Sequence, residues 1–425
     1  MKILLVEPEF PIPSKERNHR SYLPIGLLKL STYHKKKGDL VKLARGNISL
    51  EELGFEPDRI FVTSLFTYWR ESVKKSVEHY RSLFPHAKIC VGGIYASLMP
   101  DDCKEYTGCD DVYVGVHSEA EKVIPDYDML ANPHNLGFQI IHASRGCIRN
   151  CKFCGVHRIE PDFSYKRSIK SEIRSNRLVF YDNNILANSH IKDILREIAD
   201  FKYKGKHVSC ESQCGFDARL LTPEIAKLIK KARFLNVRIA WDGPWSDFRK
   251  IKKRIDMLVD AGYKSKDIFV FMIYNWDIDF NEMLKKVKKC REWRVQIADC
   301  RFRPINQKYD KYSPLKKQTY NDYYIHPKWA DELVKRFRRI VRRQNICVRM
   351  GFKKYSQKLE ARGGRDRGIR RRLMQQLRHF GYNISKIRQV IPVKDGFKVN
   401  VRVSKENYEV ILSADYQVRS ITKRE

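Results

Sequence analysis

The sequence predicts an α/β protein built on parallel β-sheets. Short apolar runs recur along residues 2–306, and segments of helix length separate them. In the first 125 residues the separating segments carry apolar residues at intervals of three and four, with Gly38 and Pro85 near the expected helix ends. This alternation is typical of βαβ units, whose strands pair in parallel.

Residues 1–125 are expected to form a doubly wound, flavodoxin-like parallel sheet. Five apolar runs mark its strands, at residues 2–7, 39–43, 60–66, 88–94 and 111–116. Ligands of such sheets bind beyond the carboxyl ends of the strands. We therefore expect a ligand among the loops that follow Glu7, Ser64, Gly92 and Gly115.

The rest of the chain divides into three predicted regions. Residues 126–137 form a linker, because Asp, Pro and Asn are frequent there. Between residues 138 and 306 six apolar runs alternate with helix-length segments, which predicts a partial parallel (β/α)6 barrel. Residues 307–425 are expected to form a basic α+β extension, with an amphipathic basic helix over 331–346 and a small antiparallel β meander at its end.

Charge and cysteine content narrow the function classes. The 425 residues carry 84 Lys and Arg against 50 Asp and Glu, a formal net charge of +34. This excess favours RNA or DNA as a partner, with an anionic membrane surface second and a generally basic proteome as the alternative without a specific partner. No apolar run approaches ~18 residues, and the 11 cysteines show no disulfide framework. We expect a cytoplasmic protein without a membrane anchor.

Three closely spaced cysteines carry the strongest chemical signal. Cys147, Cys151 and Cys154 follow a predicted strand, in a loop opened by Arg145 and Gly146. Thiolates are soft ligands, and three of them within eight residues can hold an iron–sulfur cluster while one iron keeps an open position. The alternative is a zinc site with a fourth ligand such as His157, but zinc sites favour paired two-residue spacings.

The spacing Cys-x-x-x-Cys-x-x-Cys on the first strand-to-helix loop of a β/α repeat, with Phe153 before the last cysteine, resembles the radical S-adenosylmethionine (SAM) superfamily. The resemblance implies a 4Fe-4S cluster on the three cysteines, and SAM as the second cofactor. It also implies cleavage of SAM to a 5′-deoxyadenosyl radical, with electrons from a flavodoxin or ferredoxin type of donor. The barrel would orient the reactants and exclude water.

The same resemblance suggests SAM contacts at strand ends, beside the alternative that these are ordinary rim residues. The candidates are Phe153, Asp182, Asn183, Ser209, Glu211, Gln213 and Asp242, with Asn184, Arg238, Asn275 and Arg303 as weaker ones. The fifth strand lacks the glycine-rich pattern often found in the family. The remaining cysteines are dispersed, so we expect buried structural thiols at Cys90, Cys103, Cys109, Cys210, Cys214, Cys290, Cys300 and Cys347.

Residues 1–125 resemble the cobalamin-binding-type domain that precedes the barrel in one radical SAM subgroup. Ser64 and Thr67 follow the third strand, and Gly92 and Gly93 end the fourth, where the missing side chains would let a flat macrocycle approach. The motif Asp-x-His-x-x-Gly is absent, and His19 is expected to be a surface residue. The alternative is a domain that keeps the fold without a cofactor.

The leading hypothesis is a radical SAM enzyme that performs cobalamin-dependent methylation of an unactivated carbon. A nucleic-acid substrate would lie along the basic stretch from Lys335 to Arg372, with Tyr320, Tyr323, Tyr324 and Trp329 available for base stacking. Two alternatives stay open. One is a cobalamin-independent cyclase, rearranging enzyme or oxidoreductase that acts on a small molecule or peptide. The other is an iron–sulfur regulator that binds nucleic acid.

Overall fold

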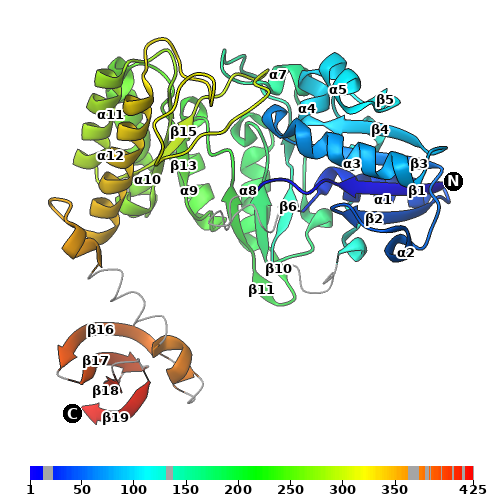
Figure 1. The fold of residues 1–425 in the computed structure, drawn as a ribbon. Helices are drawn as coiled ribbons and strands as arrows, with labels where there is room; N and C mark the ends of the chain where they lie inside the picture. Colours follow the sequence, from blue (N-terminus) through cyan, green and yellow to red (C-terminus); the bar gives the residue numbers. More distant parts are fainter. Residues whose placement is uncertain are drawn as a thin grey trace. The chain divides into compact units, whose positions relative to one another are not determined.

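A computed structural model describes residues 1–12, 23–130, 137–361, 373–378, 382, 384–393, 395–403, 406–413 and 417–424 (Figure 1). The contacts divide the chain into two units, Met1–Val341 and Arg342–Glu425. The boundary falls within helix α12 (Asp331–Met350). No helix among the described residues combines the length and the apolar character needed to cross a bilayer.

The first unit begins with a five-stranded parallel sheet in the order β2-β1-β3-β4-β5, which is the flavodoxin-like order that the sequence predicts. Its strands are β1 (Lys2–Glu7), β2 (Leu40–Arg45), β3 (Arg59–Ser64), β4 (Lys88–Gly93) and β5 (Asp111–Val112). The helices of this region are α1 (Ile25–Lys36), α2 (Leu50–Leu53), α3 (Arg70–Leu83), α4 (Ile94–Leu98), α5 (Pro100–Thr107) and α6 (Ser118–Glu121).

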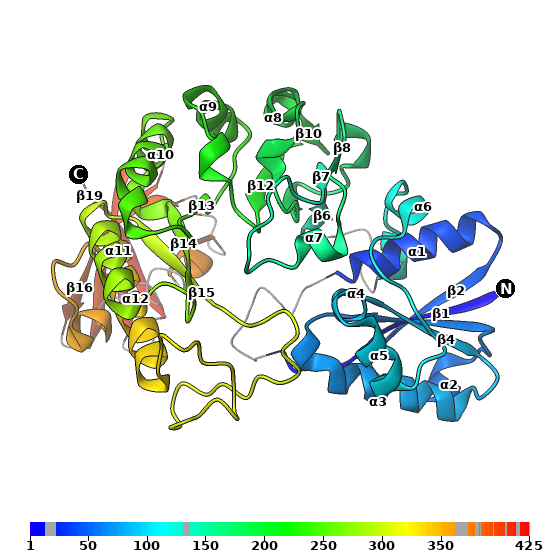
Figure 2. The same cartoon turned by 90° about the horizontal axis from the view of Figure 1, so that it is seen from above.

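Both faces of this sheet are covered. Figure 2 shows α1 on one face and α3 on the other. On the central strand, Ile3 and Leu5 pack with Leu27 of α1, whereas Leu4 belongs to the cluster that includes Val73 of α3. The continuous apolar run of β1 is therefore explained by burial from both sides.

The second region of this unit contains two three-stranded parallel sheets, with the orders β12-β9-β6 and β13-β14-β15. The isolated bridges Cys210–Phe234 and Phe216–Ile239 link the first sheet to the start of the second. Its strands are β6 (Gln139–Ile141), β9 (Arg177–Phe180), β12 (Ser209–Ser212), β13 (Arg238–Ala240), β14 (Phe269–Tyr274) and β15 (Gln296–Arg301). Each of the six predicted runs contains a strand, although most strands are shorter than the runs.

Helices cover the outer side of these strands (Figure 2). They are α8 (Ile191–Asp200), α9 (Pro223–Lys231), α10 (Phe248–Asp260) and α11 (Phe280–Glu292), and with the strands they bury the largest apolar cluster of the protein. The short strands β7 (Ser144–Arg145) and β8 (Ser164–Tyr165) pair antiparallel, and the small helix α7 (Val156–Ile159) lies between them in the chain. Strands β10 (Lys202–Tyr203) and β11 (Lys206–His207) form a separate hairpin.

An irregular segment, residues 302–330, connects this region to the N-terminal sheet. Its Gln307 carbonyl accepts a hydrogen bond from Thr67 Oγ1 at 2.6 Å, and Lys308 forms an ion pair with Asp102 of α5. The Arg303 guanidinium lies 5.1 Å from the ring centre of Tyr68. These contacts join the two parts of the first unit at the carboxyl ends of the N-terminal strands.

The second unit ends in a four-stranded antiparallel sheet of consecutive strands, β16 (Ile384–Val393), β17 (Gly396–Val403), β18 (Glu406–Ser413) and β19 (Val418–Arg424). Its small core contains Val399, Val401, Val410 and Leu412, packed with Leu373 and Leu377. The alternating burial of β17 and β18 shows that one face of the sheet is covered.

The close approach of β3 and β4 predicts a strong effect of one methyl group. Gly93 has φ +99°, and a Cβ at this position would lie 2.3 Å from the Ser64 carbonyl oxygen. We expect Gly93→Ala to lower the free energy of unfolding by about 1–3 kcal/mol. Gly92→Ala is the matched control, because its Cβ would meet Tyr113 Cβ at an ordinary 3.6 Å. Urea denaturation measures both variants, and equal effects would contradict this explanation.

Candidate metal centre and cofactor site

The three cysteines of the motif lie together on the loop between β7 and α7. All are free and half-buried, and the Cys154 N–H donates to the Cys151 carbonyl at 2.9 Å. Burial raises the pKa of Cys151, and the neighbouring thiols of Cys154 and Cys147 raise it further. Burial is also the main cause of the raised pKa of Cys154. The thiols are thus close enough to interact electrostatically, and a bound metal would favour their thiolate forms.

A buried carboxylate holds the start of this loop. Asp182, fully buried after β9, accepts hydrogen bonds from the Ala143 N–H at 3.0 Å and from both the N–H (2.5 Å) and the hydroxyl (2.7 Å) of Ser144. Burial raises its pKa to about 6, although these donors oppose the shift. The Asp182 carboxylate is therefore already bound by backbone and hydroxyl donors at the start of the cysteine loop. The sequence analysis predicted a contact with SAM for this residue and did not predict its contact with the loop.

A second carboxylate, Glu160, closes the other end of the loop. It accepts hydrogen bonds from the Gly146 N–H at 2.6 Å and from Asn183 Nδ2 at 3.0 Å, and it pairs with Arg145 at 2.8 Å. Gly146 has φ +73°, and a Cβ there would lie 2.2 Å from the Asp162 carbonyl oxygen. The loop is therefore tightly folded, and Asn183 is one of the residues that fasten it.

Polar groups around Cys147 form a network that the sequence analysis largely missed. The Cys147 sulfur accepts a hydrogen bond from the Arg149 N–H at 3.4 Å and lies 3.8 Å from Asn184 Nδ2. Asp217 binds Arg149 at 3.0 Å and Arg219 at 2.7 Å. Arg149 lies inside the motif and could have been recognised, whereas no spacing rule relates Asp217 and Arg219 to the cysteines.

A cavity of about 780 Å³ opens beside the cysteine loop. Cys151 and Phe153 contribute to its wall from the loop, and Asp242 contributes from the end of β13. Burial raises the pKa of Asp242, whose Oδ1 accepts a hydrogen bond from the Ile273 N–H at 3.2 Å. The other lining residues are Asn150, Lys152, Asp217, Ala218, Arg219, Ala240, Trp241, Gly243, Asp247, Lys250, Ile251, Lys253, Arg254, Trp276 and Asp277.

The cysteine loop offers the donor set of an iron–sulfur cluster. Its three thiols are free and lie within eight residues, and Cys151 lines the adjoining cavity. Thiolates are soft ligands, and three of them can hold a cluster while one iron keeps an open position. The residues present therefore fit such a cluster.

Three other predicted SAM residues lie on or beside β12. Glu211 is buried and pairs with Arg238 at 2.5 Å, with Arg177 3.5 Å away. Ser209 begins the strand at the opposite end from the cysteine loop, and its hydroxyl donates to Asn176 O at 3.4 Å. Gln213 follows the strand and is half-buried. The structure does not bring these three residues into the wall of the 780 Å³ cavity.

The weaker strand-end candidates have protein partners as well. The amide of Asn275 is buried, donates to Tyr324 O at 2.8 Å and accepts from the His326 N–H at 3.0 Å. Arg303 pairs with Asp310 at 2.5 Å. Both residues therefore position the irregular segment 302–330.

The predicted cobalamin residues lie at the carboxyl edge of the N-terminal sheet. Ser64 is buried, and its hydroxyl donates to Gly92 O at 2.7 Å and accepts from the Ala96 N–H at 3.1 Å. Thr67 is also buried and bonded to Gln307. These two hydroxyls have protein partners, and Gly93 serves the close contact of β3 with β4. His19 lies outside the described residues.

Two of the remaining cysteines contradict the expectation of buried structural thiols. Cys214 and Cys300 are exposed, and Cys90 is half-buried. Although each of the two residues as a whole is exposed, the protein atoms around the Cys214 and Cys300 thiols withdraw them from water and raise their pKa to about 12. Both follow or belong to strands of the second region, so a pattern of apolar neighbours could not distinguish a thiol facing open space from a packed one.

The predicted base-stacking residues are also corrected. Tyr323 is fully buried and donates its hydroxyl to Asp331, and Trp329 is buried with its Nε1 bonded to Ile278 O. Of the four aromatic residues, Tyr320 is the exposed one, at 72%. Within the basic stretch, Lys335 pairs with Asp331 and Arg342 with Glu360. Arg370, Arg371 and Arg372 lie outside the described residues.

Two solved structures of the radical SAM methyltransferase TsrM from Kitasatospora setae share this fold. The first, with cobalamin and a [4Fe-4S] cluster bound, matches 70% of this chain and 74% of its own at 13% identity and TM-score 0.55. The second, with tryptophan substrate and the SAM analogue aza-SAM bound, matches 70% and 72% at 13% identity and TM-score 0.54. No protein-family model and no curated protein matches the sequence. The predicted α/β fold is confirmed, and it is shared with these two structures.

The hydrogen bonds of Asp182 predict a requirement for it in metal loading. In Asp182→Ala the donors of Ala143 and Ser144 lose their buried acceptor, which costs about 1–3 kcal/mol for each unpaired group. We expect less iron per chain after anaerobic reconstitution and a lower melting temperature. The control is Ser209→Ala, at the end of β12 that lies away from the cysteine loop. It should leave the iron content and the melting temperature unchanged. Full iron loading of the Asp182 variant would contradict this role.

Proposed function

We propose that the chain is a radical SAM methyltransferase. It holds a 4Fe-4S cluster on Cys147, Cys151 and Cys154, SAM in the adjoining cavity, and cobalamin at the carboxyl edge of the N-terminal sheet. The observation that carries this proposal is the placement of three free thiols beside a 780 Å³ cavity that Cys151 and Asp242 both line. The shared fold with TsrM supports it, because the two TsrM structures hold cobalamin with a [4Fe-4S] cluster and the SAM analogue aza-SAM, respectively.

The cofactors, when bound, supply reductive cleavage of SAM at the open iron and a carrier for the methyl group. The residues of the chain supply charge and shape. The carboxylate of Asp217 is the main cause of the raised pKa of Arg219, with smaller contributions from Cys151 and Cys147. The Arg219 guanidinium in turn lowers the pKa of Cys151, so it favours the thiolate form of that residue. Phe153 packs edge-on against Trp276 with ring centres 6.0 Å apart, and the two rings form an apolar part of the cavity wall.

Asp242 is suited to orient a cationic cofactor. Its carboxyl is largely enclosed at the end of β13, and burial raises its pKa. A sulfonium or ammonium group in the cavity would favour the charged carboxylate, because an opposite charge offsets the loss of solvation. We therefore assign Asp242, more than Asp182 or Glu211, to SAM binding.

Contact between the N-terminal domain and the cysteine loop supports cobalamin as the methyl carrier. Gly155 directly follows Cys154, and a Cβ at Gly155 would lie 3.1 Å from Leu98 Cδ2 of α4. Helix α4 begins where β4 ends, at the edge where ligands of such sheets bind. A carrier at this edge would therefore lie next to the cluster loop.

Loss of one motif cysteine should abolish SAM cleavage. We expect Cys151→Ala to produce only background 5′-deoxyadenosine after anaerobic reconstitution and reduction, because the cluster loses one of three thiolate ligands. Cys90→Ala, which changes a half-buried thiol outside the motif, is the matched control. Mass spectrometry of SAM products measures both variants. If the purified, reduced wild type left SAM intact while holding its cluster, the regulator hypothesis would be favoured.

Cobalamin binding is tested separately from SAM cleavage. After reconstitution with hydroxocobalamin and desalting, we expect corrin absorbance to remain with the protein. We also expect a methylated product to form only in its presence. The residues at the sheet edge would enclose the macrocycle, so binding should protect the domain from proteolysis. SAM cleavage without corrin binding would instead favour the cobalamin-independent alternatives.

A further inference from the structure

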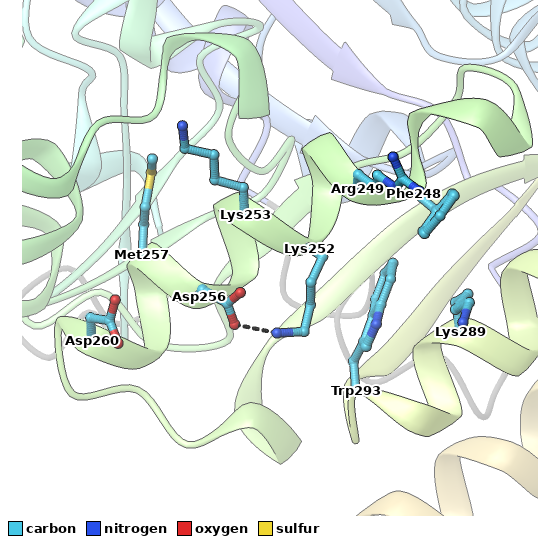
Figure 3. Close-up of a pocket in the computed structure, with 9 residues that line it drawn as sticks. All are labelled: Phe248, Arg249, Lys252, Lys253, Asp256, Met257, Asp260, Lys289 and Trp293. Atoms are coloured by element: carbon cyan, nitrogen blue, oxygen red, sulfur yellow. Dashed lines mark hydrogen bonds and ion pairs between the residues drawn. The ribbon is translucent and has the colours of Figure 1, made fainter.

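A second cavity, of about 500 Å³, lies between helices α10 and α11 on the outer side of the strands (Figure 3). It combines four cationic and two aromatic side chains with two carboxylates. The lining residues are Phe248, Arg249, Lys252, Lys253, Asp256, Met257, Asp260, Lys289 and Trp293. We call this cavity the α10–α11 groove. None of these residues belongs to the cluster motif or to the predicted SAM contacts.

Two of the four cations in the α10–α11 groove are available to a ligand. Lys252 pairs with Asp256 at 2.6 Å, as Figure 3 shows, and Lys289 pairs with Glu292 at 2.7 Å. No described carboxylate forms an ion pair with Arg249 or Lys253, and both residues are exposed. The Arg249 guanidinium lies 5.6 Å from the ring centre of Phe248. Exposed cations without an ion-pair partner at the rim of a concave site favour an anionic ligand.

The two aromatic rings of the groove are fixed from behind. Trp293 stacks on Trp241 with ring centres 5.6 Å apart, and Phe248 stacks on Trp245 at 4.9 Å. Trp293 and Phe248 are half-buried and line the groove. The Phe248 ring is also contacted by the cations of Arg249 and Lys289. Trp293 therefore offers an ordered ring beside the cations, a combination that suits a base and its phosphate.

The groove adjoins the cavity of the cysteine loop. Lys253 lines both cavities. Trp241, on which Trp293 stacks, lines the 780 Å³ cavity. A chain-like ligand held in the groove can therefore extend past Lys253 towards Cys151 and Asp242, whereas a compact anion would fill the groove alone.

We propose that the α10–α11 groove binds single-stranded nucleic acid, with phosphates at Arg249 and Lys253 and a base against Trp293. The inference names nucleic acid as the substrate class. It rests on the proposed function, because that function supplies the reaction on the bound nucleic acid. The concave shape and stacked rings favour a strand over a flat membrane surface. Tyr323 and Trp329, two of the aromatic residues predicted for base stacking, are buried, whereas Trp293 lines the groove.

The test uses the full chain and fluorescein-labelled 12-nucleotide RNA and DNA strands, with fluorescence anisotropy at several salt concentrations. We expect the double variant Arg249→Gln/Lys253→Gln to weaken binding about tenfold. The slope of log K against log salt should become shallower by about 1.4, because two phosphate contacts are lost. The matched control is Lys285→Gln/Lys288→Gln, which removes two exposed charges of α11 that line neither cavity. The control should bind as the wild type does.

Several outcomes would overturn the proposal. Equal weakening in both double variants would show that only the general charge of the chain matters. Adenosine monophosphate binding as tightly as the strands would indicate a nucleotide site. Loss of binding to an acidic electron-donor protein, with strand binding intact, would assign the groove to that protein. The binding measurement needs no cluster, SAM or turnover. A negative result would therefore not contradict the proposed chemistry, and loss of SAM cleavage would not contradict nucleic-acid binding in the groove.

Discussion

The candidate site depends on one buried carboxylate. Strands β6 and β9 pair in parallel, and Asp182 lies just beyond the end of that pairing, where it receives the donors of Ala143 and Ser144. Burying a carboxyl is unfavourable, as its raised pKa shows, and the three hydrogen bonds offset that penalty only while the loop keeps its course. Because Ser144 begins β7, directly before the cysteine loop, this interaction fixes the start of the loop, and Glu160 holds its other end.

Local sequence patterns could predict the strands and the cysteine motif, but not the partners of the polar side chains. Each predicted strand contained a run of apolar residues, and three cysteines within eight residues are informative by spacing alone. Asp182 and Glu211 were expected to face a ligand because they end or line strands. Instead, Asp182 binds a loop 38 residues away in the chain, and Glu211 binds Arg238, 27 residues away. Such contacts depend on how distant strands pair in the folded protein, and the local pattern of apolar residues does not reveal that pairing.

The same limit explains the errors in the irregular segment 302–330. Its polar and aromatic composition suggested aromatic rings exposed for base stacking, yet Tyr323 and Trp329 are buried. Their polar atoms find partners in Asp331 and Ile278, and the amide of Asn275 binds the backbone on either side of Ile325. The burial of an aromatic residue outside a periodic helix or strand cannot be read from its neighbours in the sequence. It depends on whether a hydrogen-bond acceptor far away in the chain can satisfy the polar atom of the ring.

The wall between the two cavities shows how charge and aromatic packing are joined in this protein. Lys286 is fully buried, donates to Trp241 O at 2.9 Å and lies near Asp242, and burial lowers its pKa to about 8. Asp242 opposes that shift, so the lysine retains more charge than its burial alone would allow. Trp241 is held by this lysine and in turn supports Trp293. The residue assigned to SAM binding and the ring assigned to a base are therefore both linked to one buried cation, Asp242 through its charge and Trp293 through the Trp241 ring.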